Sequence, residues 1–169
     1  MANTPDITPV DATPWLEPLV QWFGFPADIF APYSFVQSNP KTIHMVSKHM
    51  EPPLKPAPLA SGIAMMSINM AHPKLSTSAA MLFGPQATRQ TIELDAAQVD
   101  LFLKRTTQSI ALEKLALCQG TGYVILMHQG VALGVGLLRW ANLEEPGLLE
   151  SMFPKAHKLN EGRSAFAQA

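Results

Sequence analysis

Residues 122–155 read GYVILMHQGVALGVGLLRWANLEEPGLLESMFPK and contain two runs typical of β-strands, which meet at Gly130. The first run, 123–126, mixes apolar and β-branched side chains that fit a pleated, mostly buried strand. In the second run, Gly134 and Gly136 are two residues apart, so they lie on the same strand face and leave it without side chains. Another protein backbone, or a nucleic-acid backbone, can approach such a face closely. The stretch therefore predicts a β-hairpin with one bare face.

Helical spacing and turn residues predict a mixed α and β chain around this hairpin. Thr13 and Pro14 are typical of a helix start, and apolar residues then recur at helical spacing as far as Gly24. The turn-forming residues 38–41 predict a second hairpin. Further elements are expected as a strand at 62–70, a helix at 76–83, a strand at 89–94, a helix capped by Asp95 that ends near Lys104 and Arg105, and a weaker segment at 109–118. The predicted fold class is α+β, with short helices around a small, mostly antiparallel β pseudo-barrel.

Length and composition predict one domain, or two small lobes packed together. The chain has 169 residues, of which 47% are hydrophobic, enough for a core of ordinary size. We expect flexible tails at 1–14 and 161–169 around one module at 15–160. The proline-rich segment 51–59 is expected to be an extended connector. It either separates a small N-terminal lobe at 15–50 from the barrel or forms a loop within one compact module.

The charge distribution leaves room for a nucleic-acid binder although the net charge is −1. The first 35 residues carry four acidic and no basic side chains, which leaves 12 basic against 9 acidic residues in the rest. The basic and imidazole groups cluster as Lys41, His44, Lys48, His49 and Lys55, and as Lys155, His157, Lys158 and Arg163. If the fold brings the two clusters together, a phosphate-binding patch follows; otherwise each is a solvated face.

Several motifs together carry a family resemblance. They are Gly122-Tyr123-Val124, Gly130, Leu133-Gly134-Val135-Gly136 and Phe153-Pro154-Lys155. In this order they resemble the C-terminal module of the bacterial RNA cytosine-5 methyltransferases related to the Sun protein, a domain of the PUA type. Residues 23–47 are similar to the lead-in of that module, and 51–68 to the link that ends at a glycine, here Gly62. The resemblance covers roughly residues 17–158.

The resemblance implies a non-catalytic RNA-binding protein with a PUA-like fold. The methyltransferase half, with its glycine-rich cofactor loop and its pair of cysteines, has no counterpart in this sequence, so no cofactor is expected. Its target would be structured ribosomal or transfer RNA, in RNA modification or ribosome biogenesis. A separately encoded RNA methyltransferase is a possible protein partner. The residues expected to contact RNA are Lys41, Lys48, Gly134, Gly136, Arg139, Trp140, Lys155 and Lys158.

Two departures from the family pattern support an alternative function. Leu137 and Glu150 stand where related modules carry basic residues, and Glu144 and Glu145 add negative charge nearby. A carboxylate there would repel RNA. The alternative is a protein-interaction module that kept the PUA-like fold and lost RNA affinity, with an adaptable surface built from Met65, Met66 and Met70. Convergence of the five predicted lysine and arginine contacts on one face would favour RNA, and neutralisation by the glutamates would favour the interaction module.

Other chemistry finds little support in the sequence. The five histidines lack the spacing and the cysteine partners of a zinc site, so no metal is expected. Cys118 is the single cysteine, and we expect a small buried side chain that fits a reducing, cytoplasmic location. A Cys118–His128 nucleophile pair has no orienting motif. No membrane span and no secretory signal are predicted, since the apolar runs are short and the first 40 residues carry no Lys or Arg.

Overall fold

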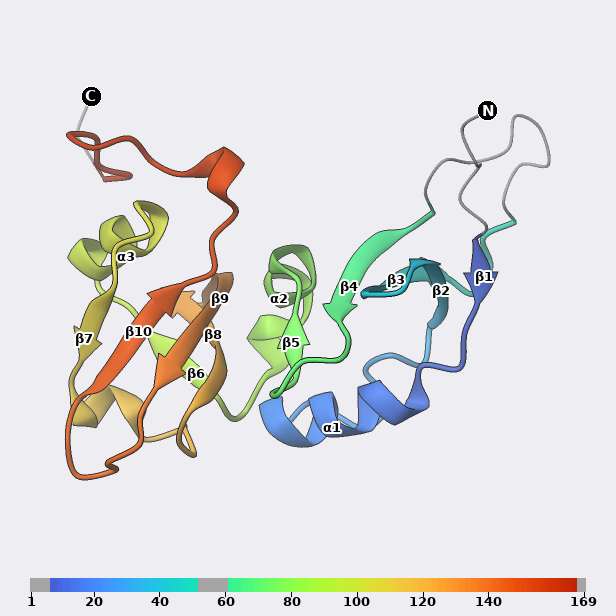
Figure 1. The fold of residues 1–169 in the computed structure, drawn as a ribbon, viewed down its shortest axis with the longest axis horizontal. Helices are drawn as coiled ribbons and strands as arrows, with labels where there is room; N and C mark the ends of the chain where they lie inside the picture. Colours follow the sequence, from blue (N-terminus) through green and yellow to red (C-terminus); the bar gives the residue numbers. More distant parts are fainter. Residues whose placement is uncertain (1–6, 52–60, 167–169) are drawn as a thin grey trace.

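The computed structural model describes residues 7–51 and 61–166, which form two five-stranded sheets and three α-helices (Figure 1). The first sheet has the spatial order β1 (Thr8–Pro9), β2 (Tyr33–Asn39), β3 (Thr42–Ser47), β4 (Ile63–Ser67) and β5 (Lys74–Leu75). All its neighbouring strands are antiparallel. Both hairpin strands predicted around residues 38–41 are present.

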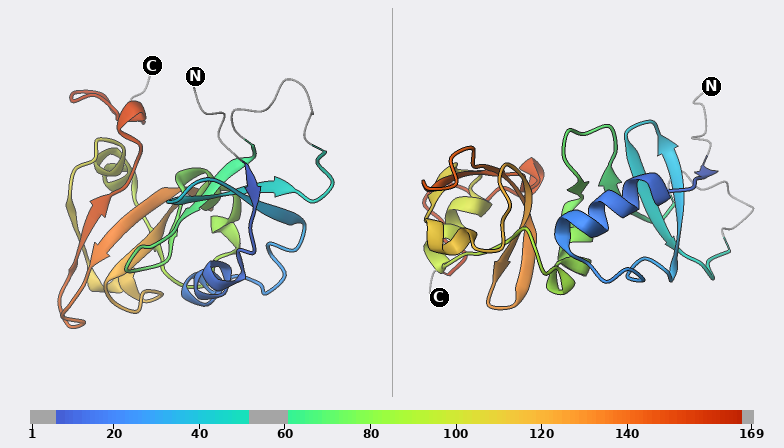
Figure 2. Two further views of the ribbon diagram at one scale, coloured as in Figure 1. Left: turned by 45° about the vertical axis from the view of Figure 1, so that its right-hand side comes forward. Right: turned by 90° about the horizontal axis from the view of Figure 1, so that it is seen from below.

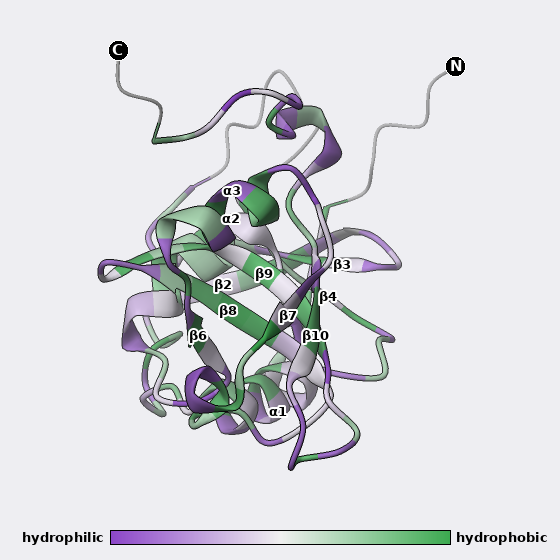
Figure 3. Cartoon of the chain, turned by 90° about the vertical axis from the view of Figure 1, so that its left-hand side faces the viewer, coloured by the Kyte–Doolittle hydropathy of each residue, from purple (hydrophilic) through white to green (hydrophobic). Residues whose placement is uncertain are grey.

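The second sheet contains the hairpin of residues 122–139. Its order is β6 (Thr91–Glu93), β8 (Gly122–His128), β9 (Val131–Arg139), β10 (Gly147–Ser151) and β7 (Gln108–Ile110). Only β6 and β8 run parallel among these neighbours. The sheet curls into a half-barrel. Figure 3 shows it from the end of the molecule that lies farther from the first sheet. The predicted α+β class with mostly antiparallel strands is confirmed.

Helix α1 (Thr13–Phe23) packs along the first sheet, where it buries Leu19 and Phe23 (Figure 1). Pro14 stands in its first turn, because a proline there costs no helical hydrogen bond. The helix ends at Gly24, whose φ of 63° is left-handed and whose N–H bonds to the Val20 carbonyl. The predicted helix and its stop are therefore confirmed.

Helix α2 (Thr77–Phe83) lies between the two sheets (Figure 2) and contacts β4 of the first and β9 of the second. Its cap is the Ser76 hydroxyl, which accepts from the Ala79 N–H at 3.0 Å. Ala80 and Phe83 of α2 are buried together with Met65 of the first sheet and Ile125 of the second. This core cluster thus holds both halves of the molecule together, and a second cluster lies between the second sheet and the helix that follows β6.

Helix α3 (Ala96–Leu103) covers the other face of the second sheet with Val99 and Phe102. Asp95 caps it, as predicted, and forms a reciprocal capping box with Gln98. The single-turn 3-10 helices are η1 (Gly84–Gln86), η2 (Leu112–Leu115) and η3 (Lys155–His157). The segment expected at 109–118 divides into the end of β7 and η2. None of the helices in the described ranges is long and apolar enough to cross a membrane.

Contacts extend across the predicted boundaries of the tails and of the lobe. The tail expected at 1–14 contains β1, because Thr8 pairs with Gln37 and the Val10 N–H bonds to the Phe35 carbonyl. The lobe expected at 15–50 extends beyond the connector, since β4 adds to β3 and completes the same sheet. The tail expected from 161 is packed as far as residue 166, where the Phe166 ring contacts His128. Most of the connector predicted at 51–59 lies outside the described residues.

Candidate nucleic-acid interface

The segment 152–166, here called the strap, leaves β10 and crosses the C-terminal end of α3. At its start, the Ser151 hydroxyl donates to the Phe102 carbonyl at 2.8 Å, and the Phe153 ring packs edge-on against Phe102. Further along, the Leu159 N–H donates to the Leu103 carbonyl at 3.0 Å. These contacts fix the strap on the helix end that carries the next two basic residues.

The contacts between the strap and α3 place six basic side chains at this end of the molecule. The Arg105 guanidinium donates to the Phe153 carbonyl, which ties the residues after α3 directly to the strap. Four of the six belong to the strap and are exposed, and Lys104 and Arg105 are partly buried. We call this set the basic end; its members are Lys104, Arg105, Lys155, His157, Lys158 and Arg163.

Only two carboxylates accompany the basic end in the segments 96–105 and 152–166, Asp100 and Glu161. Asp100 is already engaged: hydrogen bonds from the Ser164 side chain and the Ala165 N–H lower the pKa of its carboxyl group, helped by the charge of Lys104. Its negative charge holds the strap in place. The basic end therefore carries an excess of positive charge on an exposed, irregular segment.

Lys104 and Arg105 did not emerge from the sequence as RNA contacts. Their position after the α3 pattern suggests only that they complement the helix dipole. They join Lys155 and Lys158 through hydrogen bonds between residues about 50 positions apart in the chain, as between Arg105 and Phe153. No local pattern signals such a pairing.

Lys41 and Lys48 lie on the first sheet, in the other half of the molecule (Figure 1). Both are exposed, but Lys41 precedes β3 and Lys48 follows it. At about 3.3 Å per residue, the strand separates their backbones by roughly 20 Å. Lys41 and Lys48, of the N-terminal basic cluster, thus lie at the first sheet, whereas the C-terminal cluster lies on the strap, where Lys104 and Arg105 join it.

Arg139 is paired with an acidic neighbour. Its Nε–H donates to the Glu150 carboxylate, and this hydrogen bond and the charge of Glu150 raise the pKa of Arg139. The pair forms because β9 and β10 are adjacent and Glu150 lies opposite Leu137, two residues from Arg139. The Glu150 carboxylate, which is expected to repel RNA, thus neutralises Arg139, one of the predicted RNA contacts.

The bare face of β9 at Gly134 and Gly136, two of the predicted RNA contacts, is covered by protein. A Cβ on Gly134 would lie 3.2 Å from the Phe102 ring, and one on Gly136 would lie 2.6 Å from a Leu149 methyl group. The glycines admit α3 and β10 rather than a nucleic acid. Both options stay open in the sequence because the covering groups come from distant segments.

Trp140, predicted to stack on a base if exposed, is buried. Trp140 is only 9% exposed, and its indole N–H donates to the Glu145 carbonyl at 2.8 Å. Tyr123 is buried as well, under the Lys74 ammonium, which lies 5.1 Å from the ring centroid. The methionine surface of the alternative function is reduced to Met70, since Met65 and Met66 belong to the core.

Within residues 7–51 and 61–166, the side chains expected for a metal site or an activated nucleophile are not gathered in one place. No three His, Cys, Asp or Glu side chains of these ranges gather as metal ligands would. Burial raises the pKa of the Cys118 thiol to about 12, and its sulfur faces the Thr91 carbonyl at 3.9 Å. His128 instead contacts the Leu94 carbonyl through Nδ1 at 2.7 Å. Cys118 and His128 thus have separate partners.

Comparison with protein-family models and with curated proteins returns no match to this chain.

Proposed function

We propose that the protein is a non-catalytic RNA-binding module of the PUA-like type, which contacts phosphates through the basic end. The observation that carries the proposal is the hydrogen bonding of the strap to α3, which gathers six basic groups at one place. Exposed lysines at such a place attract phosphate oxygens and release counterions from RNA. The resemblance of residues 122–155 to the Sun-related module supports the same function.

A structured RNA is the expected ligand. The basic groups sit on a short irregular segment rather than along a groove, which suits phosphates at a stem end or loop. Ribosomal or transfer RNA, in RNA modification or ribosome biogenesis within the cytoplasm, is the target class that the resemblance favours. A separately encoded RNA methyltransferase would then supply the catalysis.

A salt titration with a fluorescent RNA hairpin tests the proposal. Affinity should fall linearly with log salt, and replacing Lys155 or Lys158 by glutamine should each make the slope shallower by about 0.7–0.9. The matched control is Lys114→Gln, which removes the same charge at the opposite end of α3, where Lys114 is paired with Asp95. No binding at low salt, or equal effects of all three variants, would contradict the proposal.

A second candidate, the protein-interaction module, is favoured by a different surface. Between α1 and the 27–35 segment lies a hollow of about 680 Å³ with Leu16, Val20, Phe30 and Phe35 among its lining residues. An apolar hollow of this size suits a side-chain cluster of a protein partner. Salt-insensitive binding of a partner, together with no RNA binding, would select this function instead.

A further inference from the structure

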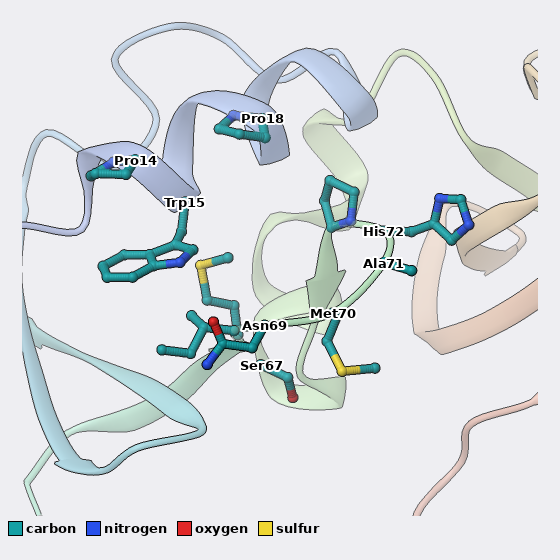
Figure 4. A pocket seen from close by; sticks show the side chains of 11 residues that line it. Pro14, Trp15, Pro18, Ser67, Asn69, Met70, Ala71 and His72 are labelled. Carbon is teal, nitrogen blue, oxygen red and sulfur yellow. The ribbon is translucent and has the colours of Figure 1, made fainter.

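A second pocket lies between the first turns of α1 and the segment from 66 to 73, and its volume is about 230 Å³. Figure 4 shows Trp15 and Pro18 reaching from α1 toward this segment, with the Asn69 amide on the other side of the gap. Trp15 and Pro18 share a helix face because they are three residues apart. Met66, Met70 and His72 complete the part of the lining that matters here.

The lining combines flat apolar groups with a polar edge. The Trp15 indole and the Pro18 ring offer faces for stacking, and Asn69 offers both an amide donor and a carbonyl acceptor. Asn69 has a left-handed φ of 62°, which turns the chain directly after Ile68 and aims the amide across the pocket. The ring centroids of Trp22 and His72 are 6.1 Å apart, so α1 also contacts the His72 end of the pocket. None of the lining residues is a carboxylate.

The backbone of Lys41 lies beside the pocket lining. The Lys41 carbonyl accepts from the N–H of Ile68, a lining residue, at 3.0 Å, and the neighbouring Thr42 pairs with Ser67. The Lys41 side chain is exposed at the turn between β2 and β3. The lining supplies an aromatic face and an amide edge, and Lys41 is the exposed basic residue whose backbone borders it. Stacking faces, edge hydrogen bonds and basic side chains together recognise a nucleotide in a single strand.

We propose that this pocket takes one unpaired nucleobase of the bound RNA, and that Lys41 contacts the adjoining phosphate. Trp15 stacks on the base and Asn69 hydrogen-bonds to its edge. The volume lies below the roughly 300–1,000 Å³ of pockets for drug-sized ligands, so it suits a fragment as small as a single base. This assignment rests on the proposed RNA-binding function and adds to it a preference for unpaired nucleotides. It also gives Lys41 a role although it lies away from the basic end.

The first experiment uses a pair of RNA hairpins with one stem and the same five-nucleotide loop, of which one loop is abasic. The wild-type protein should bind the intact loop about tenfold more tightly than the abasic loop, the order expected of one stacked base. Trp15→Leu and Asn69→Gly should remove this preference, and Trp15→Phe should restore part of it. Glycine at 69 preserves the left-handed backbone. Glu17→Gln is the control on the same helix, because Glu17 lines the other hollow.

The second experiment titrates the four ribonucleoside monophosphates into isotope-labelled protein whose Lys155 and Lys158 are both replaced by glutamine. The expected result is a shift of the Trp15 indole N–H resonance for at least one nucleotide, with weaker binding in Lys41→Gln. This readout is independent of the basic end. Thermal unfolding of each variant shows whether it has kept its fold.

The outcomes separate this inference from the proposed function. If Lys155→Gln weakens hairpin binding but the intact and abasic loops bind equally well to the wild type, the proposed function stands and the nucleobase pocket is wrong. If no RNA binds but a nucleotide shifts Trp15, the pocket stands and the basic end loses its role. If neither RNA nor nucleotide binds, both are wrong.

Discussion

The indole N–H of Trp22 donates to the carbonyl of Tyr123 at 2.8 Å, across 101 positions of the chain. Trp22 lies in the last turn of α1, and Tyr123 lies at the start of β8. The same indole covers Gly122, where an added Cβ would come within 2.3 Å of a Trp22 ring carbon. The glycine that begins β8 thus provides space for a contact between α1 and the second sheet.

We predict that Gly122→Ala lowers the free energy of unfolding by about 1–3 kcal/mol, because the new methyl group overlaps the Trp22 ring. The double variant Gly122→Ala, Trp22→Leu should lose less free energy of unfolding than the sum of the two single changes. The reason is that the smaller leucine side chain leaves room for the methyl group. Urea unfolding of the four proteins of this cycle measures the coupling. Additive effects would mean that the indole does not constrain Gly122.

The Ser151 hydroxyl is the buried link between the strap and α3. It donates to the Phe102 carbonyl and accepts from the Phe153 N–H at 3.2 Å. Ser151→Ala should therefore lower the free energy of unfolding by about 1–3 kcal/mol, since two backbone groups lose their partner. RNA affinity should fall with it, although no charge changes. Ser109→Ala, an exposed serine of neighbouring β7, is the control and should change neither quantity.

Local signals were enough to predict most elements of this fold. Gly24, Ser76 and Asp95 mark helix ends through hydrogen bonds within one turn. The turns at 38–41 and around Gly130 fixed both hairpins for the same reason. The sequence does not mark β10, because Pro146 and Gly147 suggest a loop and its neighbours β7 and β9 make it a strand.

The candidate site was less predictable, because it depends on contacts between distant segments. Lys155 and Lys158 were expected, but their basic neighbours Lys104 and Arg105 join them through the strap. Trp140 had the residue type for stacking, and its burial follows from the turn that brings the Glu145 carbonyl to its N–H. Trp15 was assigned to the helical apolar face, and the sequence does not reveal that it also lines a pocket with Asn69.

Cys118 should be a slow nucleophile in the folded protein. Burial raises the pKa of its thiol from 9.0 to about 12, so little thiolate exists at pH 8. Iodoacetamide should react at least about tenfold more slowly with the folded chain than with the chain in urea. A folded-state rate equal to that in urea would contradict the burial.

The same thiol makes stability depend on pH. Between pH 9 and 12 the unfolded chain has lost the thiol proton that the folded chain retains, so the free energy of unfolding should fall as pH rises through this window. The full contribution of the buried thiol is present below pH 9. Because lysines and tyrosines titrate in the same range, the measurement compares wild type with Cys118→Ala, whose decline should be less steep. Parallel stability curves for the two proteins would exclude this linkage.

The pairing of Arg139 with Glu150 predicts unequal responses to two charge changes. Arg139→Gln should leave RNA affinity within about twofold of wild type, because the guanidinium is already engaged by the carboxylate. Glu150→Gln removes the opposing charge and frees Arg139, so affinity should rise and the salt dependence should become steeper by up to about 0.9. Hairpin binding at several salt concentrations measures both. The double variant Arg139→Gln, Glu150→Gln is the control. Its RNA affinity should equal that of wild type, because the gain from removing Glu150 requires Arg139 to be present. A strong loss in Arg139→Gln alone would show that the guanidinium leaves Glu150 for RNA.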